Sequence, residues 1–302
     1  MQEVISAIKK SGVPFTPNTP LHTYTTWKIG GPFDLVVLPR SVEEISACTR
    51  IFNSAGIPSM IIGKGSNMLV SDEGFHGAVL RLSGAFDTVS FRDDGVIAGA
   101  GFSLITLSLQ AVEYGFTGLE FAGGIPGTVG GAVCMNAGAH GSDISQTLSR
   151  VLIMNETGGL KTLEAKDLIF GYRNSVIQHK PWVLLEATFS LLQGDRNAIV
   201  ERTKLFKEKR MRTQPLKQPS CGSVFRNPLP LFAAEVIESC GLKSIGGAKF
   251  SEIHSNFIVN TGEATAKDVL ALIELAEERA KQEHSVTLVR EVQFVGFNER
   301  VL

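Results

Sequence analysis

A glycine-rich tract at residues 122–141 is the strongest constraint on the structure of this chain. From residue 123 to residue 141 the tract contains seven glycines, together with Pro126, Thr128 and Asn136. We expect an irregular segment, because the tract is too long for a turn and too irregular for a helix. Backbone without Cβ atoms can lie directly against a large flat or phosphorylated ligand, whereas close strand packing at a barrel corner is the alternative.

A second glycine-rich loop, residues 63–67, does not match either of the common phosphate-binding templates. A Walker loop requires Ser or Thr after Gly63-Lys64, but Gly65 stands there. A dinucleotide fingerprint requires a third glycine before a helix, and that glycine is missing both here and at residues 99–104. Successive backbone N–H groups with small polar side chains still suit an anion, although an ordinary tight turn is the alternative.

Composition excludes several classes of protein. The 302 residues carry 29 basic and 30 acidic side chains, so nothing draws the chain to nucleic acid or an anionic membrane. The charge-free stretch 121–142 contains too much glycine for a membrane helix, and the N-terminus lacks the pattern of a signal peptide. The four cysteines form no CxxC motif and show no metal-ligand spacing with the histidines. We therefore predict a soluble, reduced cytoplasmic protein without a metal.

Two α/β lobes, residues 1–80 and 81–200, are predicted from alternating apolar runs and helical patterns. A change in composition near residues 195–205 separates them from a last region, 201–302. Ser41 and Glu44 form a capping-box pattern at the start of the first helix, and Thr265 opens the last one. Strands are predicted at 34–39, 60–62, 68–70, 182–190, 257–260 and 292–296, and helices from 41, from 104 to 115, at 198–212, before 241 and from 265. Glycine-rich loops on both lobes suggest a nucleotide cofactor.

A series of ordered motifs resembles the UDP-N-acetylenolpyruvoylglucosamine reductases, the MurB family, from about Pro20 to Gly296. These motifs are Thr25-Thr-Trp-Lys-Ile-Gly-Gly-Pro32, Ile62-Gly-Lys-Gly-Ser-Asn67, the tract Ala122–Gly138, Gly171-Tyr-Arg-Asn-Ser175, Pro219-Ser-Cys-Gly-Ser-Val-Phe-Arg-Asn-Pro228, Ile245-Gly-Gly-Ala248 and Glu291. The longer form of the family has an extra tyrosine-bearing loop that covers the substrate. No such insertion is present, so the chain resembles the shorter, type II form.

The resemblance implies an α+β fold with two domains. A two-lobed FAD-binding domain of the PCMH (vanillyl-alcohol oxidase-like) type is expected over 1–200, and an α/β substrate-binding domain over 201–302. The last strand is a candidate to return to the FAD-binding domain. The implied function is the FAD-mediated, NADPH-dependent reduction of a UDP-sugar in peptidoglycan precursor synthesis, which supports cell-wall biogenesis, cell shape and division. Noncovalent FAD, NADPH as cosubstrate and a cytoplasmic monomer are implied as well.

The same resemblance implies the ligand contacts. Expected FAD contacts are Ile62, Gly63, Lys64, Gly65, Ser66, Asn67, Gly123, Gly124, Pro126, Gly127, Thr128, Gly130, Gly131, Asn136, Gly138 and Arg210. Arg210 is chosen from the basic cluster Lys207, Lys209, Arg210 and Arg212, although a solvated helix face is the usual meaning of such a cluster. Tyr172, Arg173 and Asn227 are expected to contact the substrate.

Arg173, Ser223 and Glu291 match the three catalytic positions of the family. Hydride addition to the enolpyruvyl group leaves negative charge on the carbon that bears the carboxylate, and this carbon then needs a proton. The resemblance assigns charge stabilisation to Arg173, proton donation to Ser223, and support of the arginine or of protonation to Glu291. Taken alone, such residues are more often a surface arginine and a turn serine, and the alternative for Glu291 is an ordinary strand-edge glutamate.

Two other functions remain open at this stage. One is a flavin oxidase on the same scaffold, acting on an alcohol or sugar, many of which bind flavin covalently. The other is a catalytically inactive protein that binds a nucleotide sugar. Because Arg173, Ser223 and Glu291 are all present, the reductase is the preferred hypothesis.

Overall fold

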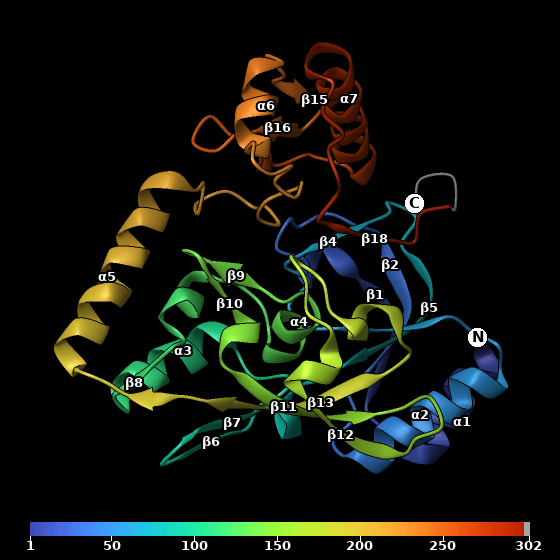
Figure 1. Ribbon diagram of the computed structural model, residues 1–302. Coiled ribbons are helices and arrows are strands. Elements are labelled where there is room, and N and C mark those ends of the chain that lie inside the picture. The colour runs from blue at the N-terminus through green and yellow to red at the C-terminus, as the bar shows by residue number, and fades with distance from the viewer. Residues whose placement is uncertain (299–302) are drawn as a thin grey trace. The chain divides into compact units, whose positions relative to one another are not determined.

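The computed structural model describes residues 1–298 and contains two compact units (Figure 1). The first unit comprises Met1–Pro17, Leu35–Gly63 and Gly77–Arg210. The second comprises Asn18–Asp34, Lys64–His76 and the chain from Met211 on. Each unit therefore consists of three separate stretches of the chain. The domains predicted from the sequence, 1–200 and 201–302, are instead contiguous. That assignment of domains stays a prediction.

A four-stranded sheet lies largely in the first unit, together with two helices. Its strand order is β1-β2-β5-β3, and β3 and β5 run parallel. The strands are β1 (Phe15–Pro20), β2 (Pro32–Val37), β3 (Ser59–Ile62) and β5 (Phe75–Arg81), and the helices are α1 (Gln2–Ser11) and α2 (Val42–Ser54). The helices bury Val4, Ile8, Ile45 and Phe52 in the main core.

The start of α2 follows the predicted capping box only in part. Ser41 Oγ accepts a hydrogen bond from the backbone N–H of Glu44 at 3.3 Å, as predicted. The Glu44 carboxylate instead accepts from the backbone N–H of Arg40 at 2.6 Å. In α7 (Ala266–His284), by contrast, Thr265 and Asp268 form both halves of the box.

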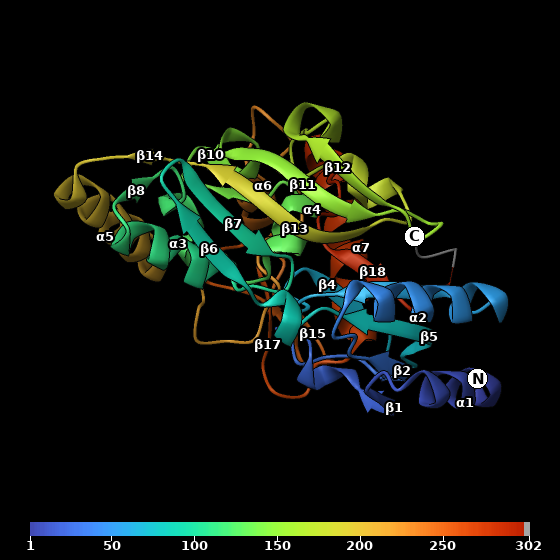
Figure 2. The ribbon, with the colours of Figure 1, turned by 90° about the horizontal axis from the view of Figure 1, so that it is seen from below.

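An antiparallel five-stranded sheet forms the other part of the first unit (Figure 2). Its order is β12-β11-β13-β7-β6. The strands are β6 (Val89–Arg92), β7 (Gly95–Gly99), β11 (Leu148–Met154), β12 (Leu160–Glu164) and β13 (Val183–Ser190). Other elements of this part are α3 (Leu104–Glu113), α5 (Arg196–Thr213) and the short strands β8 (Phe116–Thr117), β10 (Ser142–Asp143) and β14 (Leu192–Gln193).

The glycine-rich tract contains a short helix, so the prediction that it is non-helical throughout was wrong. Helix α4 (Val129–Cys134) begins at Thr128, whose Oγ1 accepts the backbone N–H of Gly131 at 3.3 Å. The helix buries Val129, Ala132 and Val133. Capping and burial thus outweigh the low helix propensity of two glycines. A 3₁₀ turn (Glu120–Gly124) precedes the helix and β9 (Gly138–Ala139) follows it.

The second unit combines two small sheets with two helices. Strands β4 (Met68–Val70) and β18 (Gln293–Val295) pair in parallel, with Met68 opposite Gln293. The three-stranded sheet consists of β15 (Ser244–Ile245), β16 (Ala248–Phe250) and β17 (Ile258–Asn260), and α6 (Ala233–Ser239) lies beside α7 (Figure 1). Helix α7 buries the apolar stripe predicted for it, Val269, Leu272, Ile273, Ala276 and Ala280.

Trp27 ties an early segment of the chain to the late strand β17. Its side chain is fully buried, and Nε1 donates a hydrogen bond to the carbonyl of Ile258 at 2.7 Å. In return, Asn260 Nδ2 donates to the carbonyl of Trp27 at 3.0 Å. These contacts explain why residues 18–34 belong to the second unit. Within residues 1–298, no helix combines the length and apolar character that crossing a membrane requires.

Candidate active site

Arg173 lies at the tip of a tight turn in the first unit. The backbones of Gly171 and Asn174 exchange two hydrogen bonds, at 3.0 and 3.2 Å, and thereby close the turn. Arg173 itself has a φ of 56°, an uncommon conformation for a residue with a side chain and one that often marks functional sites. Its guanidinium carbon lies 5.1 Å from the centre of the half-exposed Tyr172 ring.

Hydrogen bonds attach this turn to the glycine-rich tract. Arg173 Nη2 donates to the carbonyl of Gly138 at 2.7 Å, although the two residues are 35 positions apart. The buried Asn136 donates from Nδ2 to the carbonyl of Gly171 at 3.0 Å, and Ser175 Oγ donates to the carbonyl of Cys134 at 2.7 Å. The structure therefore brings together residues predicted for substrate binding and residues predicted for cofactor binding.

Most predicted cofactor glycines are close to other protein atoms, as in the alternative of tight turns and close packing. Within the first unit, a Cβ atom at Gly63 would lie 2.5 Å from Thr128 Oγ1. A Cβ at Gly138 would lie 2.5 Å from the carbonyl oxygen of Ser142. At Gly65, where φ is 56°, a Cβ would collide with the carbonyl of Tyr24. These positions require glycine for the packing of the protein itself.

Gly131 differs from these glycines. It is exposed and lies within α4, and the nearest atom to a Cβ at this position would be Thr128 Oγ1 at 3.6 Å. The protein alone would accept alanine here, and alanine would favour the helix by about 0.5–1 kcal/mol. An exposed helical glycine with open space above it fits a backbone surface that a flat ligand covers.

Helix α5 places one cation of the predicted basic cluster against the tract. Arg210 is partly buried, and a Cβ at Gly124 would lie 2.6 Å from Arg210 Cδ, whereas Lys207, Lys209 and Arg212 are exposed. Burial lowers the pKa of the Arg210 guanidinium from its ordinary value. Of the four cations, Arg210 alone therefore lies on the predicted cofactor tract.

Further contacts anchor α5 and show a residue that the sequence analysis missed. Arg202 pairs with the buried Glu120 at 2.9 Å. The His140 ring stacks on Phe206, with 4.1 Å between ring centres, and burial and the nearby cations Lys209 and Arg210 lower the pKa of His140. This imidazole belongs to the tract itself, and no motif or spacing in the sequence indicates its stacking on Phe206.

The loop of residues 64–67 is joined to the segment that carries Glu291, all within the second unit. Asn67 Nδ2 donates to the carbonyl of Glu291 at 3.1 Å, and the backbone N–H of Gln293 donates to the carbonyl of Asn67 at 2.9 Å. The parallel pair β4–β18 continues directly from these contacts. Glu291 thus lies beside a predicted cofactor loop that is far from it in sequence.

Ser223 and Glu291 come from adjacent segments of the second unit. Ser223 is half-buried and follows Gly222, whose φ is 86°. The backbone N–H of Glu291 donates to the carbonyl of Val224 at 2.8 Å. Burial, with a smaller contribution from the Glu291 carboxylate, raises the pKa of the Cys221 thiol.

Asn256 holds the Ser223 segment in place and was not predicted from the sequence. Its side chain is buried, Nδ2 donates to the carbonyl of Phe225 at 2.8 Å, and Oδ1 accepts the N–H of Phe225 at 2.9 Å. The backbone carbonyl of Asn256 also accepts the N–H of Val224 at 2.9 Å. The one signal in the sequence is that Asn256 is a polar residue directly before an apolar strand. A polar side chain buried at such a position generally forms hydrogen bonds.

His254 supports Asn256 from the preceding turn. Its Nδ1 accepts the backbone N–H of Asn256 at 3.3 Å, and burial lowers the pKa of the imidazole. Asn227, predicted to contact the substrate, has its Oδ1 engaged by the backbone N–H of Ala233 at 3.1 Å, at the start of α6. Its contact with a substrate stays a prediction.

Two family models match the chain. The C-terminal domain of UDP-N-acetylenolpyruvoylglucosamine reductase matches residues 214–295, and an FAD binding domain matches residues 33–164. A UDP-N-acetylenolpyruvoylglucosamine reductase of Bacillus subtilis is 43% identical over 302 residues, which are 99% of this chain and 100% of the relative. One from Bacillus cereus is 48% identical over 92% of this chain and 94% of the relative. This chain belongs to the UDP-N-acetylenolpyruvoylglucosamine reductase family.

Solved structures agree with membership of the reductase family. The crystal structure of UDP-N-acetylenolpyruvylglucosamine reductase (MurB) from Thermus caldophilus covers 94% of this chain and 98% of its own, with 34% identity and a TM-score of 0.79. A variant of berberine bridge enzyme, at 15% identity and a TM-score of 0.50, shares the fold over 64% of this chain and 44% of its own. The predicted family, fold class and FAD-binding oxidoreductase class are thereby confirmed.

We predict that Asn256→Ala destabilises this reductase-family chain strongly. The change leaves the buried N–H and C=O of Phe225 without their carboxamide partner, and each such group costs roughly 1–3 kcal/mol. We expect the free energy of unfolding to fall by about 2–5 kcal/mol in urea titrations followed by circular dichroism. Asn155→Ala is the matched control, because Asn155 Oδ1 accepts the N–H groups of Thr157 and Gly159 in an exposed turn. Equal losses in the two variants would contradict the role of Asn256.

Proposed function

We propose that this chain catalyses the NADPH-dependent reduction of UDP-N-acetylenolpyruvoylglucosamine to UDP-N-acetylmuramate with noncovalently bound FAD. Family membership and the FAD binding domain support the proposal. The observation that carries it is the hydrogen bond from Arg173 to Gly138, which joins a candidate carboxylate-binding side chain to the glycine-rich tract. We place the reaction in peptidoglycan precursor synthesis in the cytoplasm and propose that the chain acts as a monomer.

The cofactor would be held by the two glycine-rich loops and one arginine. Backbone N–H groups of residues 63–67 suit the pyrophosphate, and the tract around Gly131 offers a backbone surface without side chains. Arg210, partly buried on Gly124, would supply positive charge near this surface. When bound, FAD supplies the two-electron carrier between NADPH and the enolpyruvyl group.

Arg173 would bind the substrate carboxylate and stabilise the charge that develops beside it. A guanidinium is planar, permanently charged and able to grip a carboxylate through two parallel hydrogen bonds. Its bond to Gly138 and the ring of Tyr172 beside it fix the direction of the side chain. The site can therefore stabilise the transition state without reorganising as the charge appears.

Ser223 would give its hydroxyl proton to the carbon that bears the carboxylate. Since a serine hydroxyl is a weak acid, a neighbouring group must polarise it or return its proton. Glu291 is the candidate for this support, because its backbone is bonded to Val224, the residue after Ser223. Asn256 would keep the serine turn in position through Val224 and Phe225.

Gly131→Ala tests where the cofactor lies. The added Cβ has room within the protein, so we expect an intact fold and a free energy of unfolding raised by about 0.5–1 kcal/mol in the cofactor-free protein. We expect flavin affinity to fall at least about tenfold, because the methyl group would occupy the ligand surface. Gly159→Ala, in the exposed turn between β11 and β12, is the control and should keep its flavin. Unchanged flavin binding in Gly131→Ala would contradict the placement.

Ser223→Ala tests the proposed chemistry. Only reduction of the substrate requires a proton from the protein, so NADPH should still reduce the flavin at nearly the normal rate. Reoxidation by the enolpyruvyl substrate should slow by about 10²–10⁴-fold, the typical effect of a lost proton donor. Arg173→Lys should impair the same step, since an ammonium cannot form the bidentate contact. Stopped-flow absorbance of the flavin measures the two steps separately.

Ser90→Ala, at an exposed position of β6, is the control for these variants and should leave both steps unchanged. If Ser223→Ala is reoxidised by the substrate as fast as the unmodified protein, the proton comes from another group, and a bound water becomes the better candidate.

A further inference from the structure

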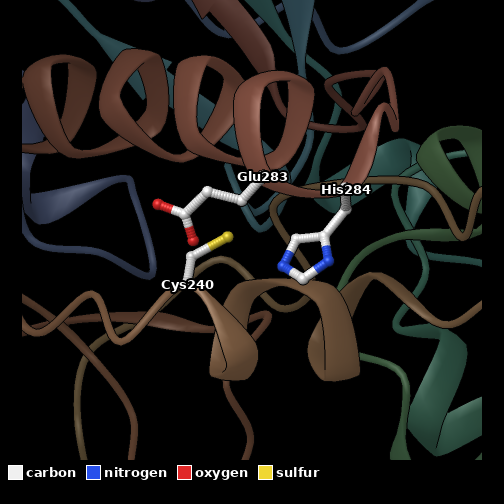
Figure 3. Close-up of side chains that lie close together, drawn as sticks. All are labelled: Cys240, Glu283 and His284. Carbon is white, nitrogen blue, oxygen red and sulfur yellow. The ribbon is translucent and has the colours of Figure 1, made fainter.

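Three potential metal ligands meet where α6 and α7 end. Cys240 caps the C-terminal end of α6, while Glu283 and His284 are the last two residues of α7. One ligand atom from each residue lies within 4.8 Å of the others, and Figure 3 shows Glu283 and His284 extending from α7 toward Cys240. Cys240 is partly buried and the other two side chains are exposed, so an ion can reach the group from solvent.

One ring nitrogen of His284 is placed to ligate a metal ion beside Cys240. Ser239 Oγ donates its proton to the carbonyl of Val236 at 2.8 Å and lies 2.8 Å from His284 Nε2. Figure 3 shows Nε2 on the side of the ring toward Cys240 and Nδ1 on the far side. A metal ion held by Nε2 would therefore replace the contact between His284 and Ser239, and Ser239 Oγ would keep its hydrogen bond to Val236.

The electrostatic surroundings suit a cation. The C-terminal ends of two helices converge here, and each presents partial negative charge from its last carbonyl groups. Arg279 pairs with Glu283 Oε1 at 2.7 Å, and the second carboxylate oxygen is a separate potential ligand atom. A bound metal would also convert the Cys240 thiol to a thiolate and release its proton to solvent.

We propose that Cys240, Glu283 and His284 form a binding site for a zinc-like divalent metal ion, with water as the fourth ligand. Thiolate, imidazole and carboxylate together match the ligand preferences of zinc, and three protein ligands plus water is a common zinc arrangement. The site is separate from Ser223 and Glu291 and does not rest on the proposed function. It would cross-link α6 to α7. Spacing along the sequence predicts no metal site, because Cys240 is remote in sequence from Glu283 and His284.

Zinc binding to the full-length flavoprotein tests the site. After removal of metals with a chelator, isothermal titration calorimetry with Zn²⁺ should show one site, and Co²⁺ should produce a thiolate–cobalt band in difference absorbance. Cys240→Ser should abolish the band, whereas Ser239→Ala, which removes the group that competes for Nε2, should bind Zn²⁺ at least as tightly as the unmodified protein. His76→Gln, at an exposed histidine paired with Asp34, is the control and should bind as before.

Two results would overturn the proposal. One is the absence of stoichiometric Zn²⁺ binding and of the cobalt band in the unmodified protein. The other is an unchanged band in Cys240→Ser. Circular dichroism of each variant in metal-free buffer must match the unmodified protein, and His284→Gln provides a second ligand variant should Cys240→Ser fail to fold.

Discussion

The buried carboxamide of Asn256 is the interaction on which the arrangement of the second unit's candidate catalytic residues depends. It pairs with both the N–H and the C=O of Phe225, and its own carbonyl accepts the N–H of Val224. Val224 in turn accepts the N–H of Glu291. The serine turn and the glutamate segment thus share one hydrogen-bonded layer. Since buried polar groups are costly when left unpaired, this layer has one favourable arrangement rather than several.

The first unit positions Arg173 by a comparable principle. The carbonyls of Cys134 and Gly138 and the carboxamide of Asn136 contact the turn at 171–175. Asn136 and Arg173 both have positive φ angles, of 43° and 56°. Hydrogen bonds from the surrounding structure maintain these uncommon conformations, as expected where a side chain must be presented at a fixed angle.

The sequence predicted the family, the fold class and most elements, because ordered motifs and apolar periodicity are local features of the chain. The sequence predicted that two glycine-rich loops bind a cofactor. It did not predict which glycines are required by packing within the protein and which leave a surface open. Gly63 and Gly138 are enclosed by protein atoms, whereas Gly131 is open. It also excluded a helix in the tract, since neither the Thr128 cap nor the burial of Val133 could be weighed without the tertiary structure.

Residues whose partners are remote in sequence leave no local pattern that predicts their contacts. Asn256 and Phe225 are 31 positions apart, and Ser239 and His284 are 45 positions apart. No local periodicity or spacing reports such pairs. The interleaving of the two units is a similar case, because it depends on Trp27 packing against a strand that begins at Ile258.

The enolpyruvyl group of the substrate is the proposed electron acceptor. An anaerobic titration of the purified flavoprotein, followed by flavin absorbance, tests this assignment. NADPH should bleach the flavin, and added UDP-N-acetylenolpyruvoylglucosamine should restore the oxidised spectrum in proportion to the amount added, with UDP-N-acetylmuramate as the product. If this substrate does not reoxidise the reduced flavin, and only oxygen does, the enolpyruvyl group is not the electron acceptor. That result would favour an oxidase.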